Sequence, residues 1–198
     1  MPAFRIAIDN VVQATINTAD WEIIAVHLSG SHRSKALATL YAGGGRYSGN
    51  APATHVIWLP EYDLAAGQRL DIWLDAEGET RPAGKTIAEL YPDAEPVPAD
   101  HDFSITDEVL AEIASRPTFH AGYAFDFTSS NGTSLAVRTP PEDDGFMLGV
   151  LWDAGRPEQC RVSLHSSNLT HLQARQAGNS YVQEVLAVGG HVSLTLAA

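Results

Sequence analysis

Charged residues are scarce in this sequence of 198 residues, since Asp, Glu, Lys and Arg make up only 18% of it. They are also unbalanced: 24 acidic residues stand against 12 basic ones, which gives a formal net charge of −12. A surface this negative repels phosphate backbones, so we expect no nucleic-acid partner. The acidic residues occur in short groups such as 142–144, which is typical of a soluble surface rather than of a nucleic-acid mimic.

Cysteine and long hydrophobic runs are also lacking. Cys160 has no second cysteine with which to form an intramolecular disulfide, which fits a reducing compartment. No apolar run approaches the roughly 20 residues that a membrane-spanning helix needs. The sequence begins with an alternating strand pattern at Phe4, Ile6 and Ile8, without a segment of the secretory type. We therefore expect a cytoplasmic protein without a membrane partner.

What the sequence does contain is an approximate internal repeat. Residues 64–74 read Leu-Ala-Ala-Gly followed by an alternating strand, and residues 186–196 read Leu-Ala-Val-Gly followed by another. Upstream, residues 23–26 and 38–40 match residues 147–150 and 162–164 at an offset that differs by only two residues. Because the same parts recur in one order at one spacing, the sequence predicts a duplicated β unit.

Short alternating strands separated by turn residues are typical of sandwiches and small barrels. We predict strands near residues 4–8, 11–16, 21–28, 35–41, 54–60 and 70–74, and again near 119–128, 133–138, 146–152, 160–166, 180–188 and 191–196. Residues 43–45 and 130–133 have the composition of turns. The predicted fold class is all-β: two similar antiparallel β-sandwich-like domains, an internal duplication, joined by a linker with one short helix.

The predicted domain boundaries follow a change in composition. Residues 1–92 form copy 1, residues 93–116 form an acidic, proline-containing linker, and residues 117–198 form copy 2. Within the linker, Thr106 has the position of an N-cap, and the apolar residues that follow share one helical face. We expect this helix to lie in the groove between the two copies.

Catalytic and metal-binding patterns are weak. None of the eight histidines has a spacing typical of a metal site, and the best local cluster, residues 100–102, reads as a solvated loop. Ser29 lacks the paired glycines of a nucleophile elbow, so a hairpin turn is expected there. Cys160 lacks a helix N-terminus that would activate its thiol. We predict no catalytic residue, no metal site and no cofactor, and favour a non-enzyme over an enzyme.

The candidate binding residues centre on one strand that differs between the copies. If the leucine and isoleucine side chains of residues 69–75 face the core, the charged residues and Trp73 face outward. A tryptophan in a polar rim suits a protein partner or a sugar ring, unless the linker or its helix covers it. Trp58 and Tyr62 leave the same two alternatives open. The predicted binding residues are Trp73, Asp71, Asp75, Arg69, Trp58 and Tyr62.

One stretch of copy 1 resembles other proteins. Residues 55–58, His-Val-Ile-Trp, and residues 64–72, Leu-Ala-Ala-Gly-Gln-Arg-Leu-Asp-Ile, are similar to a segment of uncharacterised small bacterial β proteins. The resemblance covers residues 21–76 and implies a bacterial β protein of unknown function. It transfers no catalytic residue.

These observations favour a non-catalytic protein-interaction protein of bacterial or phage origin. A toxin-neutralising immunity protein is a special case of this function. Its acidity would suit a basic partner. A carbohydrate or small-ligand binding module is the first alternative. A hydrolase or metalloenzyme with a site in an interdomain cleft is the second. The sequence leaves open whether the chain forms a homo-oligomer.

Overall fold

Each half of the chain contributes six strands, and the strands of the second half repeat the order of the first. The computed structural model describes residues 1–48, 53–94, 106–174, 176 and 178–197. The first half contains β1 (Ala3–Ile8), β2 (Val11–Asn17), β3 (Ile23–Ser31), β4 (Ala38–Arg46), β5 (Thr54–Leu64) and β6 (Arg69–Asp75). The second half contains β7 (Ala124–Ser129), β8 (Ser134–Arg138), β9 (Gly145–Asp153), β10 (Gln159–Ser167), β11 (Asn179–Ala187) and β12 (His191–Leu196). The helices are α1 (Ile87–Leu90), α2 (Asp107–Ser115) and α3 (Leu169–Gln173).

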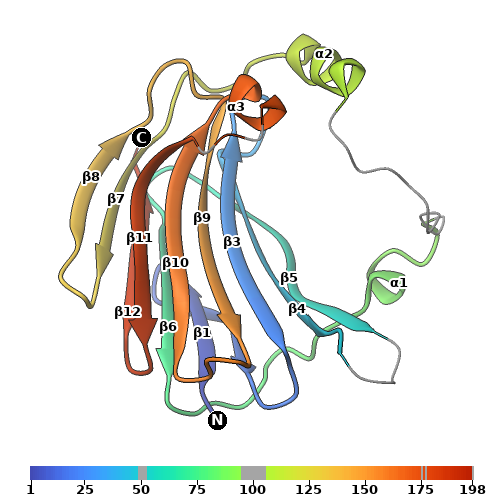
Figure 1. The fold of residues 1–198 in the computed structure, drawn as a ribbon, viewed down its shortest axis with the longest axis vertical. Helices are drawn as coiled ribbons and strands as arrows, with labels where there is room; N and C mark the ends of the chain where they lie inside the picture. Colours follow the sequence, from blue (N-terminus) through green and yellow to red (C-terminus); the bar gives the residue numbers. More distant parts are fainter. Residues whose placement is uncertain (49–52, 95–105, 175, 177, 198) are drawn as a thin grey trace.

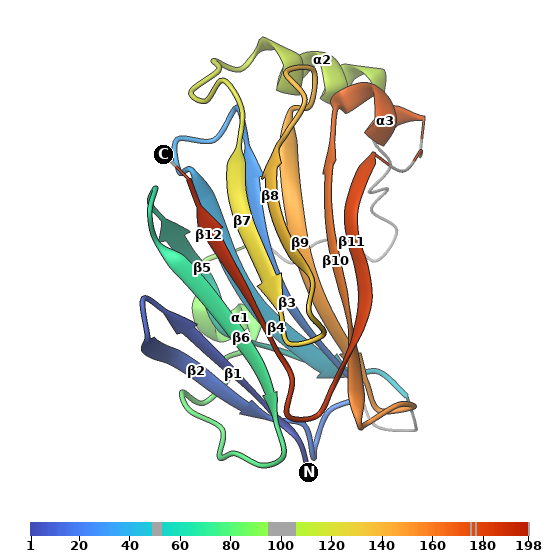
Figure 2. The same cartoon turned by 90° about the vertical axis from the view of Figure 1, so that its left-hand side faces the viewer.

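The strands form two antiparallel sheets that face each other (Figures 1 and 2). Sheet A has the order β2-β1-β6-β12-β7-β8, and sheet B has the order β11-β10-β9-β3-β4-β5. The all-β prediction is confirmed. Each sheet draws half of its strands from each copy, so the two copies are joined at the β6–β12 and β3–β9 pairs.

The central strand pairs support the duplication. In sheet B, Val26 pairs with Val150, and in sheet A, Asp71 pairs with Ser193. Each pair joins two residues that the sequence repeat aligns with each other. Equivalent residues pair with each other only where a two-fold axis passes between them. An approximate two-fold axis therefore relates the halves and crosses the centre of both sheets.

A continuous core lies between the sheets and belongs to both halves. Its largest fully buried side chains include Phe4 from the first half and Trp152 from the second. Leu70, Ile72 and Leu74 face inward, as their alternation predicts. The buried residues form one cluster that runs through both copies. Burial of this apolar surface is the main term that holds the halves together.

One side of the sandwich is closed by the chain that leaves β6. Arg81 pairs with Thr15 on β2, and Lys85 pairs with Ile57 on β5. Because β2 and β5 are edge strands of different sheets, this segment bridges the two edges. It continues into α1, whose N-cap residue Thr86 forms a capping box.

Helix α2 begins where the sequence predicts, because Thr106 Oγ1 accepts a hydrogen bond from the Val109 amide. The prediction that this helix lies in a groove between two domains is wrong, because both sheets run continuously through the two halves of the chain. The helix lies over one end of the sandwich and contacts α3 (Figure 1). Gln173 of α3 donates to Asp107 Oδ1 across 2.7 Å.

Two expected turns have different outcomes. The turn at residues 130–133 is confirmed, with Gly132 at φ +91° and its amide bonded to the Ser129 carbonyl. Residues 43–45 lie instead inside β4, and Ser29 lies inside β3. The glycine composition of residues 43–45 predicted a turn. In the structure, Gly43 and Gly45 instead leave room for neighbouring tyrosine rings, as described below.

Candidate functional site

The residues predicted around Trp73 lie on the outer face of sheet A, where they mainly contact one another. The Arg5 guanidinium stacks 3.8 Å from the centre of the Trp73 ring, and the His191 ring lies on it at 6.2 Å between centroids. Arg5 also pairs with Asp75, its Nε lying 2.7 Å from Oδ2. Residues of its own sheet therefore cover part of Trp73, and it remains partly exposed.

Asp71 is buried although it lies on the outer face of the sheet, with 1% of its surface exposed. Its Oδ1 accepts hydrogen bonds from Ser193 Oγ and from the Arg69 guanidinium. Arg69 also donates to Ser193. These contacts link β6 to β12 on the two-fold axis, so Asp71 and Arg69 join the two halves.

Trp58 and Tyr62 do not belong to an exposed site. Trp58 is 3% exposed and meets Trp21 edge to face at 5.1 Å, and Tyr62 packs against the same core. A register shift between β4 and β5 explains this position, because it turns consecutive residues of β5 into buried ones. The structure therefore places both side chains in sheet B, away from Trp73; the buried Trp58 is not an exposed binding residue, whereas Tyr62 is half-buried.

The nucleophile and metal candidates find no supporting partners. Burial raises the pKa of the Cys160 thiol to about 12, which makes it inert at neutral pH. Among the described residues, no group of three or more histidine, cysteine, aspartate or glutamate side chains is placed to hold a metal. The cluster at residues 100–102 lies outside the described residues.

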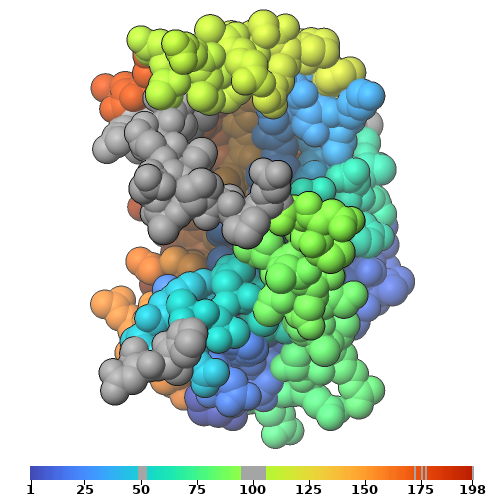
Figure 3. All heavy atoms as spheres, turned by 90° about the vertical axis from the view of Figure 1, so that its right-hand side faces the viewer, coloured from blue at the N-terminus to red at the C-terminus, as the bar shows by residue number. Residues whose placement is uncertain are grey.

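The outer face of sheet B is hollowed. The strand registers place five residues in one row across it: Gln183, Ser163, Gly149, His27 and Tyr41. Figure 3 looks onto this face and shows a recess between α2 above and α1 with β4 and β5 below, with β3 and β9 at its floor. The small residues at the middle of the row lower the floor, because they leave no long side chain there.

Two adjoining hollows make up this recess, which we call the sheet B groove. One hollow of about 640 Å³ lies toward α2 and α3, and one of about 490 Å³ lies over β9, β10 and β11. Met147 lines both of them, so the two lie side by side. Volumes of this order suit a small ligand. The lining mixes apolar side chains with serine, glutamine, histidine and arginine side chains.

Beside the groove lies a set of rings, His27, Tyr41, His55 and Tyr47, which we call the tyrosine platform. Tyr41 Oη lies 3.0 Å from His55 Nε2, and Tyr47 Oη lies 2.6 Å from His55 Nδ1. The His27 ring lines the smaller hollow and lies 6.4 Å from the Tyr41 ring. The platform therefore extends the groove toward β5 with aromatic rings that are held by hydrogen bonds.

The glycine run explains why these rings lie flat. A Cβ at position 43 would collide with the Tyr41 ring, and a Cβ at position 45 would collide with the Tyr47 ring. Both glycines face the outer side of β4, and the rings cover the space that their missing side chains leave. Sequence reasoning missed this platform; its one signal was a pair of tyrosines flanking three glycines.

Burial favours the uncharged forms of two platform rings, His27 and Tyr41. Desolvation lowers the pKa of His27 below its usual value of 6.5. Desolvation, and then the neighbouring Tyr47 and Tyr91, raises the pKa of Tyr41 above its usual value of 10.0. Neutral rings with hydrogen-bonding edges are suited to contact a polar, uncharged surface.

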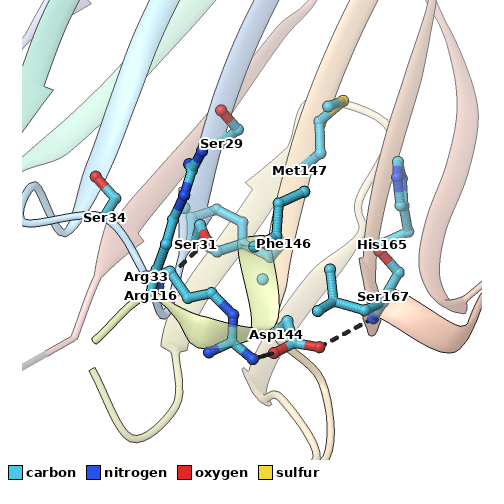
Figure 4. Close-up of a pocket in the computed structure, with 14 residues that line it drawn as sticks. Ser29, Ser31, Arg33, Ser34, Arg116, Asp144, Phe146, Met147, His165 and Ser167 are labelled. Carbon is cyan, nitrogen blue, oxygen red and sulfur yellow. Dashed lines mark hydrogen bonds and ion pairs between the residues drawn. The ribbon is translucent and has the colours of Figure 1, made fainter. Parts of the chain in front are cut away.

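In the part of the chain that the structure describes, two carboxylates line the groove, those of Asp144 and Glu184. Asp144 Oδ1 lies 3.1 Å from Arg33 Nη2, and its Oδ2 accepts a hydrogen bond from the Leu169 amide (Figure 4). Glu184 accepts from Thr133 at the edge of the sheet. Glycoside hydrolysis ordinarily needs two carboxyl groups facing the same bond.

Comparisons with known proteins add no assignment: no family model, no curated protein and no solved structure matches the chain. The resemblance of residues 21–76 to small bacterial β proteins thus stays a prediction. In the described ranges, none of the helices has the length and apolar character that crossing a membrane requires.

Proposed function

We propose that this chain is a non-catalytic binding protein that holds a saccharide in the sheet B groove, against the tyrosine platform. The observation that carries the proposal is the geometry of β4. Its glycines let two tyrosine rings lie flat on the sheet, and His55 fixes both rings through hydrogen bonds. A ring surface held by hydrogen bonds beside a polar groove fits the apolar face and the hydroxyl edge of a sugar.

The polar side chains of the groove supply the hydroxyl partners. Ser163 and Gln183 lie in the same row as His27, and Ser29 lies two residues further along β3, on the same face. Serine hydroxyls both donate and accept, as do glutamine amides, which suits a ligand whose hydroxyls do the same. The position of these groups on strands, rather than on loops, holds them in fixed places.

A glycan array probed with the full chain, followed by calorimetric titration of the strongest ligand, tests the proposal. Tyr47→Ala should weaken binding about three- to tenfold, because the ring is 49% exposed and removal costs mainly ligand contact. Trp73→Ala, an aromatic truncation on the opposite sheet, should leave binding unchanged. No saccharide signal, or equal binding by Tyr47→Ala, would overturn the proposal.

A protein partner on sheet A is the second candidate. It is favoured by the partly exposed stack of Arg5, Trp73 and His191, which offers a ring and a cation on one surface. An affinity pull-down with wild-type and Trp73→Ala baits separates the two. A stoichiometric partner that Trp73→Ala loses would favour sheet A over the groove. Under either proposal we place the protein in the cytoplasm, where its buried thiol would stay reduced.

A further inference from the structure

The hollow at the α2 end of the groove differs chemically from the rest. It is lined by the guanidinium groups of Arg33 and Arg116, by the His165 ring, and by the hydroxyls of Ser29, Ser31 and Ser34. Figure 4 shows Ser29 and Ser31 on β3, Met147 on β9 and His165 on β10 around the same space. Two arginines in one hollow stand out in a chain with only 12 basic residues and a net charge of −12.

We infer that this hollow receives an anionic group of the ligand, a carboxylate or a sulfate carried by the saccharide, between Arg33, Arg116 and the serine hydroxyls. The inference rests on the proposed saccharide binding and names the class of saccharide, an acidic one. Arginine presents a planar fork of donors that matches both anions with two parallel hydrogen bonds.

The two arginines have different roles. Arg33 is held in place, since its side chain is 17% exposed and pairs with Asp144 across 3.1 Å. Arg116 ends α2 and pairs with Glu112 across 2.8 Å, and both side chains are more than half exposed. An exposed pair of this kind contributes little to stability. Arg116 is therefore free to exchange Glu112 for a ligand anion at small cost.

The acidic character of the whole chain does not oppose this local preference. Charges beyond about 8 Å are largely screened at physiological ionic strength, so the nearest groups dominate. The carboxylate that lines this hollow, Asp144, already accepts from Arg33 and from the Leu169 amide. The remaining lining consists of hydrogen-bond donors and apolar groups, apart from the exposed Glu112 beside Arg116.

The test is a titration of the full ¹⁵N-labelled chain, followed by amide shifts, with a neutral oligosaccharide, its uronic-acid counterpart, its sulfated counterpart and inorganic sulfate. We expect the acidic oligosaccharides to bind at least about tenfold more tightly than the neutral one, with shifts at Ser34 and Leu169. Arg116→Gln should abolish that difference, and Arg138→Gln, a matched change on exposed β8, should keep it. Carboxylate and sulfate are distinguished by which counterpart binds more tightly.

Glu112→Gln supplies a gain of function that unfolding cannot imitate. Removing the competing carboxylate should tighten acidic-saccharide binding about two- to fivefold, the scale of an exposed ion pair, and leave neutral-saccharide binding unchanged.

Equal binding of neutral and acidic ligands, or an Arg116→Gln chain that still prefers the acidic one, would overturn the anion site while saccharide binding stands. If no saccharide binds but inorganic sulfate shifts the amide signals of the wild type and not those of Arg116→Gln, the saccharide proposal fails and the anion site stands. If nothing shifts, both fail.

Discussion

At the scale of single residues, the same amino acid has opposite roles on the two sheets. Trp58 is packed against Trp21 in the core, whereas Trp73 lies on an outer face beneath Arg5. In the sequence both are large aromatic residues near polar ones, so the sequence alone does not show which of the two is buried. The separation comes from the register shift between β4 and β5, which local alternation does not predict.

Trp58→Ala should lower the free energy of unfolding by about 3–5 kcal/mol, because it leaves a cavity in the core. Trp73→Ala should cost less than about 2 kcal/mol, since it removes a partly exposed ring and a cation–π contact. Urea unfolding followed by circular dichroism measures both values. Equal losses for the two variants would contradict the assignment of Trp58 to the core.

Histidine protonation gives a second prediction at this scale. Burial lowers the pKa of His27 and of His32 below 6.5 in the folded chain. Between pH 6.5 and those lower values, the unfolded chain binds protons that the folded chain does not, so stability falls as the pH drops. Above pH 6.5 both states are neutral and the contribution is complete.

We therefore expect a lower melting temperature at pH 5.5 than at pH 7.5, and a smaller difference in His27→Gln. Hydrogen bonds lower the pKa of the Asp9 carboxyl from its usual value of 3.8. The contribution of this carboxylate to stability is therefore complete above pH 3.8 and is lost only at more acid pH. The two pH windows are therefore distinct. A melting temperature that rises on acidification from pH 7.5 to 5.5 would contradict this sign.

At the scale of elements, most strands follow from the sequence. Alternation and turn residues predict β1, β2, β6 and the strands of the second half within a few residues. The exception is β4, which runs to Arg46 through three glycines. Local propensity favours a turn there, whereas pairing with β3 and β5 holds the glycines in a strand, and the rings of Tyr41 and Tyr47 cover Gly43 and Gly45.

Gly43→Ala should push the Tyr41 ring away from β4 and break its hydrogen bond to His55. Saccharide affinity should fall about two- to tenfold, while the chain still folds. Gly67→Ala is the matched control: this turn glycine has φ +84° and no neighbour near its missing Cβ. It should cost about 1–2 kcal/mol of stability and leave affinity unchanged. Equal affinity in wild type and Gly43→Ala would argue against the platform.

At the scale of the whole molecule, the duplication builds one pair of shared sheets. The joining strand pairs, β3–β9 and β6–β12, lie at the centre of each sheet. Each half alone would expose one of these strands in both sheets, together with half of the common core. Exposed central edges favour association with any complementary strand.

A chain cut between residues 95 and 105 tests this relation. Residues 1–94 and 106–198 expressed separately should lack cooperative thermal unfolding, and mixing them should restore it with a 1:1 complex. Far-UV circular dichroism and size-exclusion chromatography follow both steps. Cooperative unfolding of either half on its own would show that the copies fold independently.

The sequence by itself determined the all-β class, the position of nearly all strands, the repeat and the N-cap of α2, because each depends on neighbours along the chain. The tertiary structure alone decided how the copies join, where Trp58 lies, and that the groove forms on sheet B. The joining of the copies and the groove across them depend on pairing between residues up to 130 positions apart, as between Ile23 and Asp153 or Arg69 and Thr195. Local alternation fixes which residues share a face, but it leaves open which strand becomes the neighbour, and the burial of one common core makes that choice.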